Sequence, residues 1–136
     1  EAVVQTFFPT HYAVKCGCAQ DYATFAAREL EFRTALRYPP ITALVNVVVR
    51  GSTAEQAMTD AGTLARHVAR DTGGKAIAIL GPAPAPLAKL RGEHRAQFFV
   101  KGGDRAAMRA AVRRALAAFP SVSRRAVVDV DPVSML

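Results

Sequence analysis

The sequence feature that most constrains the fold is a run of three prolines on alternate positions, Pro82, Pro84 and Pro86. Each proline fixes its backbone φ, lacks an N–H donor and biases the preceding residue towards an extended conformation. The segment is therefore predicted to be neither a helix nor a central strand but a stiff, exposed bridge. It leads through a predicted basic loop into residues 93–101, where polar and apolar side chains alternate.

The segments around this bridge alternate between strand and helix patterns. The predicted order is a strand at 41–50, a helix from 54 to the Gly73-Gly74 pair, strands at 76–80 and 93–101, a helix from 104 to 119, and a strand at 125–130. This β-α-β-β-α-β order predicts an α+β domain of the ferredoxin-like, split βαβ class, with a four-stranded antiparallel sheet and two helices on one face.

Local signals define the ends and faces of these elements. Ser52 and Glu55 form a predicted capping box for the first domain helix, and Asp104 is the predicted N-cap of the second. In the strand at 93–101, the period of two predicts two faces. Arg95, Gln97, Phe99 and Lys101 point to one side, and His94, Ala96, Phe98 and Val100 point to the core.

The first forty residues carry a different pattern. They are predicted to hold a short strand at 2–6, a loop to residue 19 and a helix from Asp21 that stops before Pro39-Pro40. This division predicts three parts: residues 1–19, a linker helix at 20–40 and the domain proper at 41–136.

Positive charge is concentrated in the middle of the chain. The net charge is +7, yet residues 86–125 alone hold ten Lys or Arg against two Asp or Glu. On the second domain helix, Arg105, Arg109 and Arg113 recur at i, i+4 and i+8 and line one edge beside Arg114. Such a cluster is typical of a surface that binds phosphates or an acidic peptide, or of a solvated face in an Arg-rich proteome.

Motifs for catalysis are not found. The glycine pairs Gly73-Gly74 and Gly102-Gly103 lack the Lys and hydroxyl residue of a phosphate-binding loop. Asp129 and Asp131 are spaced to share one side of a strand and are predicted to pair with Arg124 or Arg125. We therefore assign no catalytic residue.

Metal binding and membrane insertion are not expected either. Cys16 and Cys18, with His11 nearby, supply too few ligands for a structural zinc site, which needs four. No window approaches the ~18 apolar residues of a membrane helix, and the N-terminus lacks the basic region of a signal peptide. A cytoplasmic protein is the default expectation.

Several stretches together resemble one known family. They are VVQTFFPTH (3–11), DYATFAAREL (21–30), RTALRYPP (33–40), GPAPAP (81–86), LAKLRG (87–92), HRAQFFVKG (94–102) and VDVDPVSML (128–136). In this order they resemble the end of the second helicase lobe, the linker helix and the C-terminal domain of the primosomal helicase PriA family. The resemblance implies a C-terminal domain like a ribosomal S10 module.

The resemblance also implies a function for the longer parent protein. Members of the family are ATP-dependent 3′–5′ DNA helicases of replication restart, and their ATP, magnesium and zinc sites lie outside the part that matches this chain. The chain itself is expected to hold no cofactor and to be non-catalytic. Expected partners are forked or single-stranded DNA, the acidic, Phe-ended tail of single-stranded DNA-binding protein, other primosome proteins and the parent's helicase lobes, in a bacterial, nucleoid-associated setting.

Carried over by position, the resemblance assigns Arg91, Arg95 and Gln97 to DNA and Arg105 and Arg109 to the acidic tail. The charge pattern adds Lys89 and Lys101 to the expected DNA contacts and Arg113 to the expected tail contacts. The helix arginines, with Lys89, Arg91 and Arg95, are predicted to surround one concave basic surface. Two departures matter: Ala96 replaces a common aromatic residue and Glu93 a common basic one, so DNA contacts should be mostly to phosphates.

Two alternative functions remain open. The first is a module that binds structured RNA, as the ribosomal protein of this fold class does; preference for structured RNA over forked DNA at matched salt would support it. The second is a structural brace against the helicase lobes, which predicts no measurable affinity for nucleic acid or tail peptide.

Overall fold

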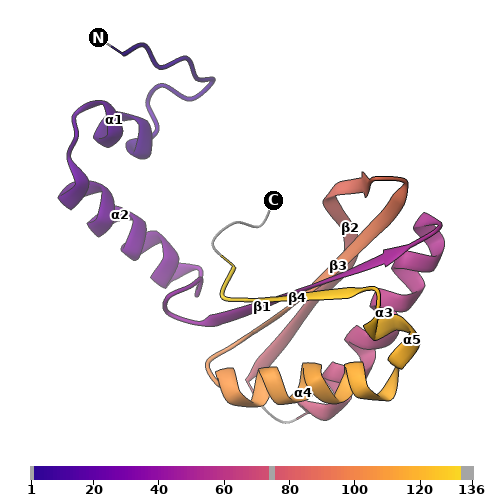
Figure 1. Ribbon diagram of the computed structural model, residues 1–136. Helices are drawn as coiled ribbons and strands as arrows, with labels where there is room; N and C mark the ends of the chain where they lie inside the picture. Colours follow the sequence, from indigo (N-terminus) through magenta and orange to yellow (C-terminus); the bar gives the residue numbers. More distant parts are fainter. Residues whose placement is uncertain (1, 74–75, 133–136) are drawn as a thin grey trace. The chain divides into compact units, whose positions relative to one another are not determined.

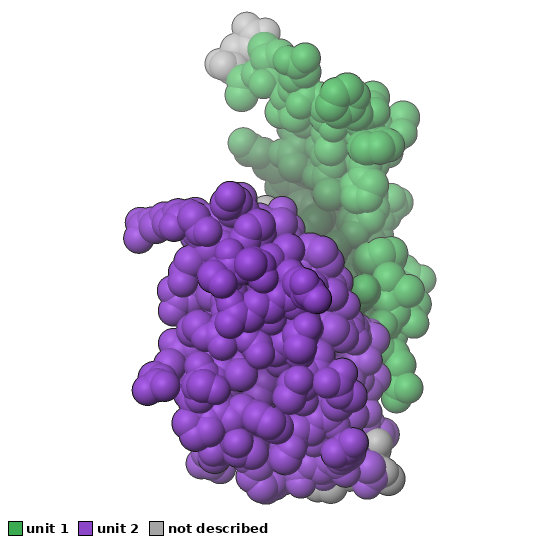
Figure 2. All heavy atoms as spheres, turned by 90° about the vertical axis from the view of Figure 1, so that its right-hand side faces the viewer, with its two compact units in different colours: residues 1–41 green, residues 42–136 purple. Residues whose placement is uncertain are grey.

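The computed structural model describes residues 2–73 and 76–132, and the chain divides into two compact units, residues 1–41 and 42–136 (Figure 2). The first unit contains α1 (Tyr12–Cys18) and α2 (Tyr22–Ala35). The second contains β1 (Ala43–Gly51), α3 (Ala54–Asp71), β2 (Ile77–Leu90), β3 (Glu93–Gly102), α4 (Arg105–Ala118), α5 (Pro120–Ser123) and β4 (Ala126–Val130).

The first unit is a pair of helices. The helix predicted from Asp21 is confirmed as α2, and the Asp21 side chain caps it by accepting from the Thr24 N–H at 3.0 Å. The strand predicted at 2–6 is wrong: these residues form no strand, and no described segment pairs with them. The loop predicted up to residue 19 is also wrong, because α1 lies within it.

A polar contact explains why the short helix α1 forms. The Tyr12 hydroxyl donates to the Glu29 carboxylate of α2, and Arg33 donates to the same carboxylate at 2.7 Å. These two hydrogen bonds hold the pKa of Glu29 below its ordinary value. A helix of seven residues has little stability alone, so its existence depends on contacts of this kind, which its own sequence does not reveal.

The second unit is an antiparallel sheet of four strands in the order β2-β3-β1-β4, and α3 and α4 pack on one of its faces (Figure 1). The predicted α+β architecture is therefore confirmed, and the strand order is consistent with a split βαβ arrangement. The two faces of β3 are as predicted at Ala96, Phe98 and Val100, which are buried while their neighbours are not, but His94 is only half-buried and lies outside the core. The three buried residues pack with Val45, Val47 and Val49 of β1 and with Leu64, Val68, Met108 and Val112 of the helices.

The helix caps agree with the sequence in one case and differ in the other. Asp104 caps α4 as predicted, accepting from the Ala107 N–H at 2.8 Å. The capping box predicted at Ser52 lies one residue too early: Thr53 caps α3 by accepting from the Gln56 N–H at 3.1 Å. The C-terminal end of α3 is Asp71, with Thr72 as its cap, and Gly74 lies outside the described residues.

The proline-rich segment is a strand, not the predicted bridge and basic loop. β2 runs through all three prolines and pairs with β3 at the edge of the sheet, with register shifts between Leu80 and Ala83 and between Pro84 and Lys89. An edge strand tolerates proline because its outer side needs no donors. At the second shift, residues 85–88 of β2 face a single residue of β3, Arg95, so they bulge out of the ladder.

A tight turn joins β2 to β3. Its two residues, Arg91 and Gly92, have φ values of +50° and +85°. Two-residue hairpin turns of this left-handed kind match the twist of the flanking strands and favour glycine. The predicted basic loop is thus reduced to one Arg-Gly turn at the tip of a long hairpin (Figure 1).

Candidate nucleic-acid interface

The sheet face that α3 and α4 do not cover, here called the open face, carries the alternate residues of the strands. Because cross-strand partners point to the same side, the register arranges them in rows. One row joins Phe99, Asn46 and Asp129, the next joins Gln97, Val48 and Val127, and a third joins Arg95 and Arg50. Polarity therefore changes along the open face, from an amide and a carboxylate at one end to two guanidinium groups at the other.

Two hollows lie on this face. The first, here called the basic hollow, has a volume of about 260 Å³ and is lined by Val48, Arg50, Leu90, Arg91, Glu93, Arg95 and Val127. Its lining contains three arginines and one carboxylate. Arg50 pairs with Glu93 at 3.0 Å, which leaves the charges of Arg91 and Arg95 in excess. The basic hollow is therefore a suitable place for an anionic group such as a phosphate.

The second, here called the amide hollow, has a volume of about 140 Å³ and is lined by Asn46, Val48, Ala85, Pro86, Leu87, Arg95, Gln97, Val127 and Asp129. The bulge of β2 forms its wall, and Ala85 within the bulge is only 4% exposed. The Arg95 side chain reaches the bulge, where its guanidinium donates to the Leu87 carbonyl oxygen at 3.5 Å. Val48, Arg95 and Val127 line both hollows, so the two hollows are adjacent.

The structure brings together part of the predicted DNA-binding set. Arg91, Arg95 and Gln97 line the two hollows, and Lys89 lies on β2 opposite His94. Lys101 also belongs to β3 but pairs with Leu44, six residues along the strand from Arg95. Ala96 is 1% exposed in the core beneath the helices, so no residue at this position could present an aromatic platform on the open face.

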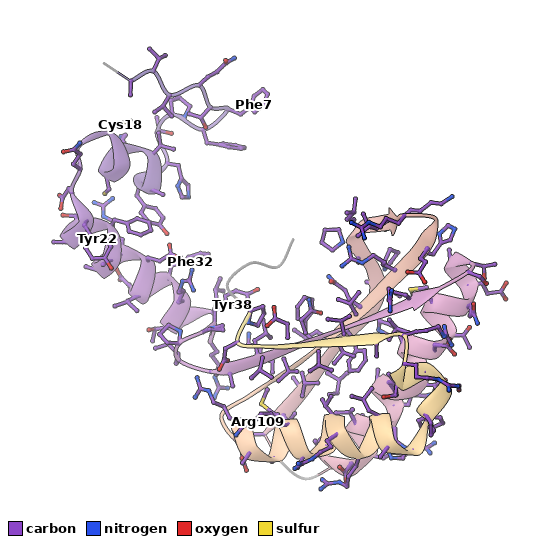
Figure 3. The ribbon with its side chains drawn as sticks, viewed as in Figure 1. Phe7, Cys18, Tyr22, Phe32, Tyr38 and Arg109 are labelled. Atoms are coloured by element: carbon purple, nitrogen blue, oxygen red, sulfur yellow. The ribbon has the colours of Figure 1, made fainter. Side chains whose placement is uncertain are left out.

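The predicted tail-binding set lies elsewhere. Arg105, Arg109 and Arg113 belong to α4 (Arg109 is labelled in Figure 3), which packs on the covered face of the sheet. The prediction that both sets surround one concave surface is therefore wrong. The physical reason is the alternation of β3: Arg95 and Gln97 point away from the core, whereas α4 packs against the core through Met108 and Val112.

Arg105 is tied to the end of β4. Its Nε–H donates to Asp131 Oδ2 at 3.0 Å, while Asp131 Oδ1 accepts from the Leu44 N–H at 3.1 Å. These two hydrogen bonds, with the positive charge of Arg109 nearby, hold the pKa of Asp131 below its ordinary value. The prediction that Asp129 or Asp131 pairs with Arg124 or Arg125 is wrong, because Arg125 reaches Asp60 of α3 at 2.9 Å instead.

Other arginines of the basic block serve the fold. Arg125 donates to the Arg50 carbonyl as well as to Asp60, and Arg114 of α4 pairs with Asp71 of α3 at 2.5 Å. Among the residues that the structure describes, Arg109 and Arg113 form no ion pair. Part of the positive charge counted in the sequence is thus used within the domain, and the charges of Arg109 and Arg113 are not neutralised by an ion pair among the described residues.

Sequence reasoning missed two residues of the open face, Asn46 and Arg50. Asn46 is 9% exposed, and its Oδ1 atom is buried without a hydrogen-bond donor among the described residues. A signal was present: both positions break an otherwise apolar strand at a spacing of four, which places them on one side of it. The hollow that Asn46 lines also needs the bulge of β2, which that spacing does not reveal.

The described residues show neither a cluster of metal ligands nor a helix that could span a membrane. Cys16 is buried and Cys18 exposed in the first unit, and within the described residues no three His, Cys, Asp or Glu side chains gather as a metal site would require. None of the helices in the described ranges is both long and apolar enough to cross a membrane.

Comparisons with known proteins agree on one family. Residues 34–133 match the model described as Primosomal protein N C-terminal domain. The chain is 32% identical over 135 residues to the Replication restart protein PriA of Treponema pallidum, covering 98% of this chain and 20% of that protein. The corresponding protein of Haemophilus influenzae is 31% identical over 137 residues, with coverages of 97% and 18%. That of Bacillus subtilis is 27% identical over 138 residues, with coverages of 98% and 17%. The chain thus spans about a fifth of the length of these relatives.

Proposed function

Because the chain belongs to the family of the primosomal protein N C-terminal domain, we propose that residues 42–136 are a nucleic-acid-binding part of a PriA replication restart helicase. In this proposal the parent couples ATP hydrolysis to 3′–5′ strand separation, and its ATP, magnesium and zinc are bound outside this chain. The chain contributes binding, not chemistry. Its setting is the bacterial cytoplasm beside the nucleoid, where forks and other primosome proteins are found.

The observation that carries the proposal is the excess positive charge of the basic hollow. Arg91 and Arg95 lie at the end of the open face that is opposite Asn46 and Asp129, and the one carboxylate of the basic hollow, Glu93, is already paired with Arg50. Guanidinium groups bind phosphate oxygens in pairs, and each phosphate contact releases a counterion from the DNA. We therefore infer that the open face holds the backbone of fork DNA, with an affinity that falls steeply as salt rises.

The test is fluorescence anisotropy with a labelled forked DNA at several salt concentrations. Replacing Arg91 and Arg95 with Gln should weaken binding and lower the salt slope by about two, since each lost phosphate contact lowers it by roughly one. Arg66→Gln is the matched control for the single Arg95→Gln variant, because each removes one positive charge and Arg66 lies on the exposed surface of α3. Equal losses in the Arg66 variant and in the single Arg95 variant would refute the open face as the binding surface.

The same titrations separate the alternatives. A structured RNA of equal length that binds more tightly than the fork at matched salt would support the RNA-binding module. No measurable affinity for either would support the structural brace, which packs on the helicase lobes of the parent chain.

A second function, binding of the acidic tail of single-stranded DNA-binding protein, is favoured by the contact at the start of α4. Asp131 already sits on Arg105 with a lowered pKa, so this corner of the domain stabilises a carboxylate. Arg109 and Arg113 continue from Arg105 along the same helix at spacings of four. An acidic peptide ending in Phe should bind there, and Arg109→Gln should weaken it several-fold, whereas Arg114→Gln, whose side chain is held by Asp71, should change it little.

A further inference from the structure

The amide hollow has the features of a pocket for a single nucleobase. Resting on the proposed function of the open face, we propose that one unpaired base of the bound strand enters this hollow, and that the base carries an exocyclic amino group. The amino group donates to Asn46 Oδ1. Its own phosphate lies in the neighbouring basic hollow.

The first support is an unsatisfied atom in a residue that lines the hollow. Asn46 is nine-tenths buried, and its Oδ1 accepts no hydrogen bond from any residue within the described ranges. Buried polar groups almost always have a partner, so an amide oxygen without one, on a residue that lines a hollow, indicates a donor supplied from outside. The Asn46 side chain lines the hollow, where that donor would arrive.

The second support is the distribution of polarity around Asn46. Val48, Val127 and the bulge with Ala85 and Pro86 supply apolar surfaces for the faces of a ring. Gln97 and Asp129 supply hydrogen-bonding groups for its edge. Asn, Gln and Asp are the side chains that read base edges, and a carboxylate accepts from the amino group of cytosine.

The third support is size and charge. The volume of about 140 Å³ is well below the ~300 Å³ of pockets for larger ligands, so it suits one ring. Asp129 disfavours a phosphate in this hollow, whereas Arg91 and Arg95 favour one in the adjoining hollow. Since Arg95 lines both, one nucleotide can place its phosphate on one side of this guanidinium and its base on the other.

The test compares two single-stranded probes that differ in one property. Homopolymers of dC and dT have equal length and charge, but cytosine presents an amino donor where thymine presents a carbonyl acceptor. The wild-type chain should bind dC about fivefold more tightly, the factor that one net hydrogen bond gives. Asn46→Leu, of similar volume, should abolish this preference, while an abasic probe should bind wild type and variant equally and with the same salt slope.

The outcomes separate this inference from the proposed function. Equal affinity of the wild type for dC and dT, or a preference that survives Asn46→Leu, overturns the base pocket. If the abasic probe still binds in a salt-dependent way, the proposed function stands even though the base pocket is refuted. If no probe binds, the proposed function and the base pocket are both refuted.

A second measurement needs no variant and so covers the case in which Asn46→Leu does not fold. In ¹H–¹⁵N spectra of the wild-type chain, the Asn46 side-chain amide should shift on addition of dCMP and much less with dTMP. If the chemical shifts of the Asn46 side-chain amide do not change at saturating dCMP, the base pocket is also refuted.

Discussion

Arg105 and Asp131 form an ion pair that joins the start of α4 to the end of β4. The Nε–H of Arg105, the first residue of α4, donates to Oδ2 of Asp131, which follows β4, at 3.0 Å. The same Asp131 makes two hydrogen bonds with the backbone of Leu44 at the start of β1: its side-chain Oδ1 accepts from the Leu44 N–H, and its own N–H donates to the Leu44 carbonyl at 2.7 Å. One aspartate therefore fastens a helix start, an edge strand and a central strand. Two expectations follow from this contact, a third from the two faces of the sheet and a fourth from the hairpin turn.

The first concerns the dependence of stability on pH. Because the folded-state pKa of Asp131 lies below its unfolded value of about 3.9, its ionised form stabilises the fold at neutral pH. This contribution is lost as the pH falls through the folded pKa. Asp131→Ala should lower the free energy of unfolding by about 1 kcal/mol at pH 7, and the difference from wild type should vanish in acid.

Urea denaturation at several pH values measures this effect. Asp129→Ala is the matched control, because Asp129 lies two residues earlier, on β4, and its side chain has no hydrogen bond or ion pair with the residues that the structure describes. A constant difference between wild type and Asp131→Ala from pH 7 to pH 2 would show that the ion pair does not carry the effect.

The second expectation links Asp131 to the acidic tail. Asp131 occupies Arg105, so it competes with an external carboxylate for the same guanidinium. Asp131→Asn keeps an acceptor near the Leu44 N–H but removes the charge, and it should tighten binding of the acidic, Phe-ended peptide by about threefold. Calorimetric titration decides the point. Weaker binding by Asp131→Asn would mean that Asp131 orients Arg105 instead of competing for it.

The third expectation is that DNA and peptide bind independently. The basic hollow lies on the open face of the sheet, and Arg109 lies on a helix that packs on the other face. At physiological salt the field of one ligand is screened over about 8 Å, so the peptide affinity should change less than about twofold when DNA is saturating. Displacement of labelled peptide by fork DNA would place both ligands on one surface.

The fourth expectation separates stability from binding at the hairpin turn. Gly92 has φ +85° and open space around it, so Gly92→Ala should cost about 1 kcal/mol of unfolding free energy through backbone strain alone. Arg91 has φ +50°, a conformation that Asn adopts more readily. Arg91→Asn should therefore raise stability by roughly 0.5 kcal/mol while weakening DNA binding. Thermal unfolding and anisotropy on the same samples test both halves, and a parallel loss of stability and affinity would contradict the assignment of Arg91 to phosphate binding.

The strands and helices of the second unit were predictable where the signal is local. The period of two in β3 identified Phe98 and Val100 as core residues, and the Asp104 cap located the start of α4. The cap of α3 was misplaced by one residue because Ser52 and Thr53 are both capping residues and each has a suitable partner three residues on. Only the backbone geometry at the helix start chooses between them.

The position of β2 and the amide hollow were not predictable in the same way. Whether Pro84 breaks a strand or sits in one depends on whether that strand lies at the edge of the sheet, which is a tertiary property. The bulge that buries Ala85 follows from pairing between β2 and β3, so the role of Asn46 beneath it could not be read from β1 alone. Likewise the separation of Arg95 from Arg109 follows from strand alternation combined with helix packing.

The prolines of β2 also bear on how the sheet meets other molecules of its own kind. A sheet grows into a fibre or an open-ended oligomer only if both of its margins can accept a further strand. Along β2, Pro82, Pro84 and Pro86 remove three amide hydrogens, and the bulge of residues 85–88 interrupts the line of carbonyls. Strand addition is thus obstructed at the β2 edge of the sheet, and only the β4 edge can accept a further strand. Two copies that paired through their β4 strands would form a dimer with a β2 strand at each edge, so the sheet would not grow further.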